Sequence, residues 1–369
     1  MKAVFAGGGT GGHLYPAIAI ANALRAADPS ARVTFYGTAD RLEARIVPAA
    51  GYPLVDIPSA PLARNPLGVA AAIWKNLSGI HSAWRALAAE RPDLIVASGG
   101  YVCFPVVVAA RAMRSIGLLQ SALVLLEINA HPGLANKLVA PFVDEVWGAY
   151  EAARASFGKR YIVTGIPVRA ALNDARNREE AARRLRLDPQ KRTLLVMGGS
   201  QGARSINEAV LALLKTHALP HRWQLLIVTG ERDYAVMAAE QRELAGKNDF
   251  AAVAYLDDLS DAYAMADVVV SRAGASTLGE LAALGLPAVL VPYPHAAQDH
   301  QRVNAQVFAD AGAADVLDDA DLTGETLWNA VHAAMAPERY DAMRSAARSL
   351  APIDATSAIL RRVAVLVRG

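Results

Sequence analysis

VFAGGGTGGH, residues 4–13, joins a short apolar segment to a glycine-rich loop, and a helical pattern at residues 17–26 follows the loop. LLVMGGSQGA, residues 194–203, repeats this order before a second helical pattern at residues 206–214. Glycine lets the backbone turn sharply and come close to a ligand. The first N–H groups of a helix have no partner inside the helix and attract anions. The two segments therefore predict two nucleotide-type α/β domains in one chain.

Neither glycine loop fits the two nucleotide-binding motifs that are most easily read from sequence. A Walker loop would need Gly-Lys-Ser/Thr, which both loops lack. A dinucleotide fingerprint would be followed by an acid at the end of the second strand. Because Tyr36-Gly37-Thr38 occupies that place, a nicotinamide-dependent enzyme is disfavoured.

Length and composition narrow the class of protein. The chain has 369 residues, 53% of them hydrophobic, which suffices for two domains with their own cores. A net charge of +2 gives no strong field for binding nucleic acid. The single cysteine, Cys103, excludes an intramolecular disulfide and favours a reducing compartment. We expect no signal peptide, because a strand pattern begins next to Met1, and no apolar stretch of the about 18 residues that a transmembrane helix needs.

Short apolar runs alternate with helical patterns along the whole chain, which predicts doubly wound parallel sheets. Strands are expected at residues 3–6, 33–36, 94–97, 122–126, 145–147, 193–197, 224–228, 251–255, 268–271 and 288–291. The run 101–110 predicts a buried helix. A linker around residues 164–170 divides a first domain, 1–165, from a second, 166–349. We expect the C-terminal helix, 354–367 within the segment 350–369, to pack back on the first domain.

SRAGASTLGE, residues 271–280, follows the apolar strand 268–270 and is the most specific segment of the second half. We expect a helix at residues 278–284 that ends at Gly285. Ser276 and Thr277 would either cap this helix or donate to a phosphate. Glu280, expected in the first helical turn, would either complete a capping box or accept hydrogen bonds from ribose hydroxyls.

Five motifs occur together in order: GGTGGH at 8–13, GTADRLE at 37–43, GGY at 99–101, GGSQGA at 198–203, and residues 271–280. Together they resemble the bacterial MurG family of glycosyltransferases, over nearly the whole chain. The resemblance implies a GT-B fold, two Rossmann-like domains facing a cleft. It implies transfer of N-acetylglucosamine from UDP-N-acetylglucosamine to the C4 hydroxyl of the lipid-diphosphate-linked muramoyl-pentapeptide (lipid I), giving lipid II with inversion at the anomeric carbon. No metal ion and no cofactor are implied.

The resemblance also implies a set of substrate-binding residues. Arg169 and Ser200 would contact the diphosphate, Leu256 the uracil, and Glu280 the ribose, while Gln301 and Asn304 would read the sugar hydroxyls. Taken singly, Arg169 is typical of a surface cation and Asn304 of a helix surface. The full set is Thr10, Gly11, Gly12, Asn129, Arg169, Ser200, Leu256, Ala275, Ser276, Thr277, Leu278, Gly279, Glu280, Gln301 and Asn304.

The reaction needs a base that takes the proton of the acceptor hydroxyl. His13 is one candidate, because the first glycine loop would point it at the cleft, although it would equally serve to bond its own loop. Glu127 is the other, because it ends an apolar strand at the edge where doubly wound folds bind ligands. The sequence leaves the choice open.

Three positions depart from the family pattern. Leu126 and Ile128 stand where the family usually has a histidine and a glutamine, so one proton-transfer group is absent. Ile166 replaces a polar residue near the expected hinge. We hypothesise that His131, just downstream, partly substitutes for the missing histidine.

A lipid-linked acceptor requires contact with a membrane. Residues 67–89 carry an apolar stripe at helical spacing with cations beside it, which is typical either of an interfacial helix on anionic lipid or of an ordinary helix packed on a sheet. The stripe consists of Ile73, Trp74, Leu77, Ile80 and Trp84. The family implies a peripheral enzyme on the cytoplasmic face of the bacterial inner membrane, with other cell-wall synthesis proteins as partners.

Three other functions fit parts of the sequence. A different GT-B enzyme would transfer a UDP-sugar to another lipid, and the donor motifs alone do not separate it from the first reading. A UDP-N-acetylglucosamine 2-epimerase would share a two-domain fold but need no acceptor. A UDP-sugar binder without activity would explain the missing histidine.

Overall fold

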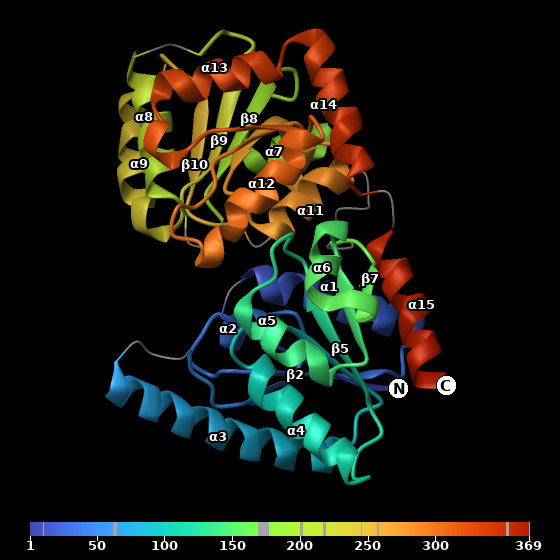
Figure 1. Cartoon of the computed structure of the whole chain (residues 1–369). Helices are drawn as coiled ribbons and strands as arrows, with labels where there is room; N and C mark the ends of the chain where they lie inside the picture. The colour runs from blue at the N-terminus through green and yellow to red at the C-terminus, as the bar shows by residue number, and fades with distance from the viewer. Residues whose placement is uncertain are drawn as a thin grey trace. The chain divides into compact units, whose positions relative to one another are not determined.

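The computed structural model describes residues 1–9, 11–61, 65–168, 177–199, 202–216, 219–244, 246–256, 258–351 and 354–368. Thr10, Arg169 and Ser200, three of the expected substrate contacts, lie outside these ranges. The chain forms two compact units, Met1–Ala170 with Ile353–Gly369, and Ala171–Pro352 (Figure 1). Each unit is built around one parallel sheet.

In the first unit, the described strands form a sheet in the order β3-β2-β1-β4-β5-β6-β7, and all of its pairings are parallel. The strands are β1 (Lys2–Gly7), β2 (Arg32–Gly37), β3 (Leu54–Asp56), β4 (Leu94–Gly99), β5 (Ala122–Glu127), β6 (Glu145–Gly148) and β7 (Tyr161–Val163). Their long apolar runs are buried on both faces, as a parallel sheet covered by helices requires.

Helices cover both faces of this sheet because the chain reverses its direction of travel after β3. Alternate strand residues such as Val4 and Ala6 pack with α3 and α4 in one core cluster, whereas Phe5 and Phe35 stack on the other face. The helices are α1 (Gly11–Ala27), α2 (Glu43–Ala49), α3 (Pro66–Glu90), α4 (Cys103–Ser115), α5 (Leu134–Val139), α6 (Arg154–Phe157) and the C-terminal α15 (Ala355–Arg368). Helix α15 contacts α1, and its Arg362 forms an ion pair with Glu145 of β6.

In the second unit, the described strands form a parallel sheet in the order β10-β9-β8-β11-β12-β13. They are β8 (Arg192–Met197), β9 (Trp223–Val228), β10 (Phe250–Val253), β11 (Ala266–Ser271), β12 (Ala288–Leu290) and β13 (Ala314–Val316). The helices are α7 (Arg178–Leu185), α8 (Arg204–Thr216), α9 (Glu231–Glu243), α10 (Ser260–Met265), α11 (Ala275–Leu284), α12 (His300–Asp310), α13 (Gly324–Ala334) and α14 (Pro337–Ser349). Helices α8, α9 and α13 share one core cluster with the sheet.

The prediction of doubly wound parallel sheets is confirmed, with errors at the edges and at helix starts. Strands β3, β7 and β13 were not predicted, because each has only three residues at the edge of a sheet, too few to show a strand pattern. Strand β10 ends at Val253 and not at residue 255. Helix α11 begins at Ala275 and not at residue 278. Among the described residues, no helix is long and apolar enough to cross a membrane.

Candidate functional site

The first unit has a switch point between β1 and β4, where neighbouring strands lead into connections that run in opposite directions. Ligands of doubly wound folds bind outside the carboxyl ends of such strands. The loops after β1 and β4 meet there: a Cβ added at Gly100, whose φ is +85°, would lie 2.3 Å from the carbonyl oxygen of Gly8. This close approach and the positive φ explain why glycine is needed at position 100.

His13 lies at this switch point, on the first turn of α1 and not on the loop as predicted. Its ring packs against the backbone of Gly99, since a Cβ there would lie 2.3 Å from Nδ1 of His13. The side chain is half-buried. Gly11 and Gly12 belong to the same helical turn, so the loop ends earlier in the chain than predicted.

Glu43 fixes the first glycine loop through a hydrogen bond, a role that was not predicted from the sequence. The carboxylate is fully buried and accepts hydrogen bonds from the Gly9 N–H at 3.0 Å, the Thr38 N–H at 3.1 Å and the Thr38 hydroxyl at 2.7 Å. A side chain at Gly8 would collide with it. The protein thus supplies its own anion to a loop that the sequence marked as a phosphate site. The motif at residues 37–43 was the available signal.

Glu127 is enclosed by the loop that follows β5. Its two carboxylate oxygens accept hydrogen bonds from Asn129 (N at 2.9 Å, Nδ2 at 3.0 Å), the Gly133 N–H at 3.2 Å and Asn136 Nδ2 at 2.8 Å. Burial raises the pKa of the Glu127 carboxyl, and these hydrogen bonds oppose the rise. Only 1% of the Glu127 surface is exposed, and its hydrogen bonds fix the loop that follows β5. On the same loop, His131 lies half-buried, 3.5 Å from the Lys137 ammonium.

The second unit has its switch point between β8 and β11. The second glycine loop leads from β8 into α8, and residues 272–274 lead from β11 into α11. A Cβ at Gly202, whose φ is +74°, would lie 2.3 Å from the Thr229 carbonyl oxygen, so this loop also depends on glycine. The first turns of α8 and α11 contain no acidic residue. Two helix starts that can favour an anion therefore lie at neighbouring strand ends.

Glu280 lies in the second turn of α11, since that helix begins at Ala275. The predicted capping box is wrong, because the N-cap residue is Gly274 and no side chain caps the helix. The Glu280 carboxylate is buried, and Oε2 accepts a hydrogen bond of 2.8 Å from the Tyr263 hydroxyl of α10. That hydroxyl lies 3.9 Å from the sulfur of Met197, the last residue of β8. Glu280 is therefore held beside the carboxyl end of β8.

Within the rest of the segment 275–280, burial separates two kinds of residue. Ser276 and Thr277 are half-buried on the first turn of α11. Ala275, Leu278 and Gly279 are buried against the body of the unit, so only their backbone could meet a ligand. The expected contacts of this segment with the donor stay a prediction.

Arg272 joins three segments at the same switch point. Its guanidinium donates to the carbonyl oxygens of Val291 and Pro292, both at 3.2 Å, and to the Ser205 hydroxyl of α8 at 2.9 Å. It also forms an ion pair of 2.5 Å with Asp319. The side chain lies within the motif at residues 271–280, but no local pattern predicts partners so far along the chain.

Gln301 and Asn304, on α12, both contact backbone near these strand ends. Gln301 Oε1 accepts a hydrogen bond of 3.0 Å from the Tyr293 N–H, and Asn304 Nδ2 donates to the Ala273 carbonyl at 3.3 Å. Asn304 is fully buried, so the reading of this residue as a helix-surface side chain is wrong. Leu256, half-buried, lies in the connection between β10 and α10.

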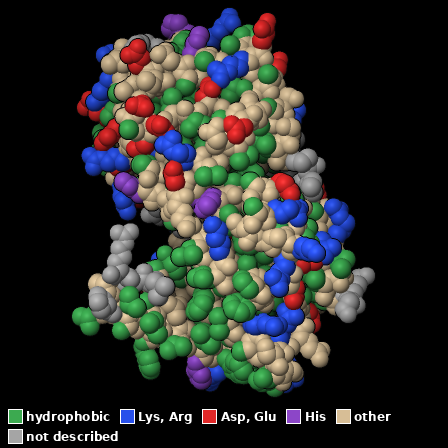
Figure 2. Space-filling model, in the orientation of Figure 1, with side chains coloured by type: hydrophobic (Ala, Val, Ile, Leu, Met, Phe, Trp, Pro, Cys, Tyr) green, Lys and Arg blue, Asp and Glu red, His purple; other side chains and the backbone are tan. Residues whose placement is uncertain are grey.

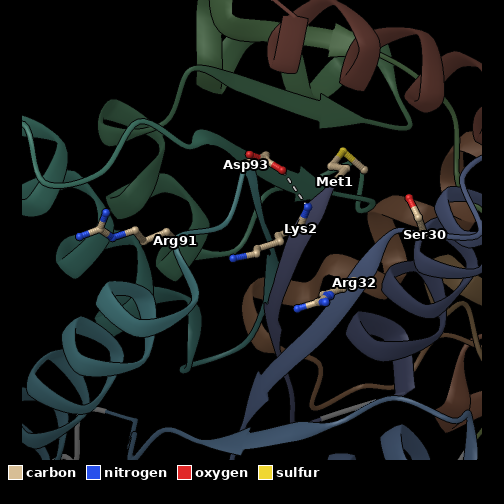
Figure 3. Close-up of a pocket in the computed structure, with 6 residues that line it drawn as sticks. All are labelled: Met1, Lys2, Ser30, Arg32, Arg91 and Asp93. Atoms are coloured by element: carbon tan, nitrogen blue, oxygen red, sulfur yellow. Dashed lines mark hydrogen bonds between the residues drawn. The ribbon is translucent and has the colours of Figure 1, made fainter.

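A pocket at the opposite edge of the first sheet does not belong to this arrangement. Figure 3 shows it at the amino ends of the strands, where the Lys2 N–H donates to Asp93 at 2.8 Å. It is lined by Met1, Lys2, Ser30, Arg32, Arg91 and Asp93. Because ligands of this fold class bind at the carboxyl ends, we place the site at the glycine loops and not here.

The expected membrane stripe divides into two parts on α3. Trp74 is 75% exposed, and Ile73 and Leu77 are exposed as well. Ile80 and Trp84 instead pack partly against the core of the first unit, as the alternative of a helix packed on the sheet predicts. Figure 2 shows apolar side chains gathered on the face that α3, α4 and α5 form. The exposed ones include Leu67, Phe104, Leu134, Leu138 and Phe142.

Comparison with known proteins assigns the family. Residues 3–147 match the glycosyltransferase family 28 N-terminal domain, and residues 193–357 match the glycosyltransferase family 28 C-terminal domain. A Moorella thermoacetica protein named UDP-N-acetylglucosamine–N-acetylmuramyl-(pentapeptide) pyrophosphoryl-undecaprenol N-acetylglucosamine transferase is 40% identical, with 98% of each chain covered. The chain belongs to the MurG family.

Solved structures agree with this assignment. The MurG crystal structure from Acinetobacter baumannii aligns with a TM-score of 0.74 and 26% identity, over 100% of this chain and 99% of that one. A Neisseria meningitidis UDP-GlcNAc 2-epimerase aligns with a TM-score of 0.68 at 14% identity, over 99% and 100%, which shows a shared fold alone. The predicted GT-B class with two Rossmann-like sheets is thus confirmed for a MurG-family chain.

Proposed function

We propose that the protein transfers N-acetylglucosamine from UDP-N-acetylglucosamine to the C4 hydroxyl of lipid I, with inversion at the anomeric carbon. Membership of the MurG family over nearly the full length is the observation that carries the proposal. The donor would bind at the switch point of the second unit, where α8 and α11 begin without acidic residues. The acceptor would bind at the first unit, whose glycine loop is already bonded to Glu43.

The donor contacts follow the order of the segments around that switch point. Uracil would lie against the backbone near Leu256, the ribose hydroxyls against Glu280, and the diphosphate against the starts of α8 and α11. As the bond from the anomeric carbon to UDP breaks, negative charge develops on the diphosphate, and helix starts stabilise such charge without a metal ion. Gln301 and Asn304 would contribute to recognition of the sugar.

We assign the role of base to His13 and a positioning role to Glu127. His13 lies at the first switch point with its ring on Gly99, whereas both oxygens of Glu127 are occupied by donors of its own loop. The acceptor oxygen forms its bond to the anomeric carbon while its proton passes to His13, and UDP leaves with the bonding electrons. Glu127 would hold Asn129 and His131 in place.

The membrane-facing surface would be the exposed part of α3 together with the neighbouring apolar side chains of α4 and α5. Trp74 and Leu77 are exposed there, and Lys75 on the same helix is exposed to meet anionic headgroups. We propose peripheral attachment to the cytoplasmic face of the inner membrane. Replacing Trp74 and Leu77 by Ser should lower binding to anionic vesicles severalfold, whereas Val236→Ser, an exposed site on α9, should not. Equal binding by both variants would contradict this surface.

The decisive experiment measures UDP release from UDP-N-acetylglucosamine with and without a short-chain lipid I analogue. We expect release only with the acceptor, together with a disaccharide product. Release with a different lipid acceptor only would indicate another GT-B transferase. Epimerised sugar without acceptor would indicate the epimerase, and binding without turnover would indicate a silent binder.

The assignment of the base is tested by variants in the same assay. His13→Asn should lower kcat by about a hundredfold or more, the usual contribution of general base catalysis. Glu127→Gln should lower activity less at high substrate concentration if it only positions its loop. Normal turnover by His13→Asn would reject this residue as the base, and unchanged turnover by His131→Ala would reject the substitution hypothesis for His131.

A further inference from the structure

We infer that Tyr263 is a positioning residue for Glu280 and thereby sets how strongly the donor site distinguishes a ribonucleotide from its deoxy analogues. The inference rests on the proposed function, in which Glu280 meets the ribose hydroxyls. It concerns a residue of α10 that lies in none of the sequence motifs. The Tyr263 hydroxyl donates a hydrogen bond of 2.8 Å to Oε2 of Glu280.

Both partners of this hydrogen bond are buried, each with 4% of its surface exposed. A hydrogen bond from a neutral donor to a buried carboxylate is stronger and more directional than one in water. A glutamate side chain has three rotatable bonds, and its last torsion has a broad minimum. Holding Oε2 from one side therefore fixes the rotation of the whole carboxylate group.

Tyr263 is itself held in place by its surroundings. Its backbone N–H donates to the Leu259 carbonyl at 2.9 Å, and its hydroxyl lies 3.9 Å from the Met197 sulfur at the carboxyl end of β8. Ala262 and Met265, on the same short helix, are buried. The tyrosine thus connects the end of β8, which leads into the second glycine loop, with the acid on α11.

The orientation of the Glu280 carboxylate matters because, in the proposed complex, it accepts hydrogen bonds from two neighbouring ribose hydroxyls. A carboxylate can accept from two neighbouring hydroxyls only when its plane faces both of them. If Tyr263 sets that plane, its removal should weaken the contribution of the hydroxyls and leave the contacts of base and phosphates unchanged. The affinity for UDP should then fall toward that for 2′-deoxy-UDP or 3′-deoxy-UDP, while the affinity for the deoxy analogues changes little.

The test is calorimetric titration of the full-length protein and of Tyr263→Phe with UDP, 2′-deoxy-UDP and 3′-deoxy-UDP. Phenylalanine keeps the ring and removes the hydroxyl only. We expect the preference of the wild type for UDP over at least one deoxy analogue to drop by about tenfold in Tyr263→Phe, as loss of a hydrogen bond to a charged group predicts. An equal loss of affinity for all three nucleotides, or an unchanged preference, would overturn the inference.

Three further variants make the result specific. Glu280→Ala should abolish the preference, and adding Tyr263→Phe to it should change nothing more, because the tyrosine acts through the acid. Tyr161→Phe removes a matched buried hydroxyl, which donates to the Tyr150 carbonyl at 2.6 Å in the first unit, and should leave the preference intact. Failure of the wild type to bind UDP would instead reject the proposed donor site, so the two failures are distinguishable.

Discussion

The two units present the same switch-point architecture but hold their loops with opposite charges. In the first unit, the buried carboxylates of Glu43 and Glu127 accept hydrogen bonds from loop N–H groups, including those of Gly9 and Gly133. In the second unit, the buried guanidinium of Arg272 donates to the carbonyl oxygens at the end of β12. Each carboxylate or guanidinium comes from an element next to the loop that it holds.

This difference suggests why one fold, used twice, can bind two different substrates. A loop whose N–H groups already face an internal carboxylate gains little from a phosphate and repels it at short range. The first turns of α8 and α11 contain no acidic residue, as is also true of α1, so these helix starts favour a diphosphate. We therefore propose that the diphosphate of the donor binds at the second unit.

Replacing the buried acid of the first unit should have the largest effect on stability. In Glu43→Gln, an amide NH₂ would face donors that now meet a carboxylate, so at least one buried N–H or hydroxyl loses its acceptor. We expect the free energy of unfolding to fall by about 3 kcal/mol. Chemical denaturation measures this change, and titration with UDP should give an affinity within about twofold of the wild type at native conditions.

The matched control for that variant is Glu151→Gln. Glu151 is a solvent-exposed acid of the first unit, paired with Arg154, and its replacement should not change stability measurably. If Glu43→Gln lowered the affinity for UDP as strongly as Arg272 variants do, the proposed division of labour between the units would be wrong.

The reverse experiment targets the cation of the second unit. In Arg272→Lys, a single ammonium cannot reach Ser205, Asp319 and the two carbonyl oxygens together. The start of α8 then loses its hydrogen bond from residue 272 to Ser205. We expect UDP binding measured by calorimetry to be about tenfold weaker, which corresponds to about 1.4 kcal/mol. Arg339→Lys is the control: Arg339, on α14, forms an ion pair with Asp315 of β13, and this variant should bind UDP normally. A lower melting temperature with unchanged UDP affinity would make Arg272 a purely structural residue.

The sequence predicted the parts of the fold that depend on local pattern. Each strand in the interior of a sheet is an apolar run followed by glycine or a helix, so β1, β4, β8 and β11 were found. The edge strands β3 and β13 have three residues each, and their pairing partners, not their own composition, make them strands. Spacing alone could not supply that information.

The candidate site also has parts that a local sequence pattern predicts and parts that only the fold shows. Glycine motifs located both switch points, because close backbone approach leaves a local signature at Gly100 and Gly202. The residues that hold those loops act across the chain: Arg272 and Asp319 are 47 positions apart. Tyr263 stands in no motif, and its partner is known only from the fold. The spacing of apolar residues on α3 likewise predicts an apolar face but not which of its residues pack on the core. Trp84 packs partly against the core, whereas Trp74 is exposed.

The smallest predicted effect concerns Cys103, which lies at the switch point of the first unit and is the single cysteine of the chain. Its sulfur accepts a hydrogen bond from the Gly99 N–H at 3.0 Å and donates to the Ala6 carbonyl at 3.2 Å. Burial raises the pKa of the thiol from 9.0 to about 12, so the folded protein keeps it protonated where the unfolded chain ionises. The resulting stabilisation is complete below pH 9 and is lost as the pH rises through this interval.

Relative to Cys103→Ala, the wild type should therefore lose about 1 kcal/mol of unfolding free energy between pH 8 and pH 10. Denaturation of both proteins at each pH measures the difference, and the shared titration of lysines and tyrosines cancels in it. The native thiol should also resist a disulfide reagent at pH 8 and react once the first unit unfolds. A rapid reaction of the native protein, or a difference that does not vary with pH, would mean that the loops at this switch point open readily. The carboxylates would then hold them less firmly than the hydrogen bonds of Glu43 and Glu127 suggest.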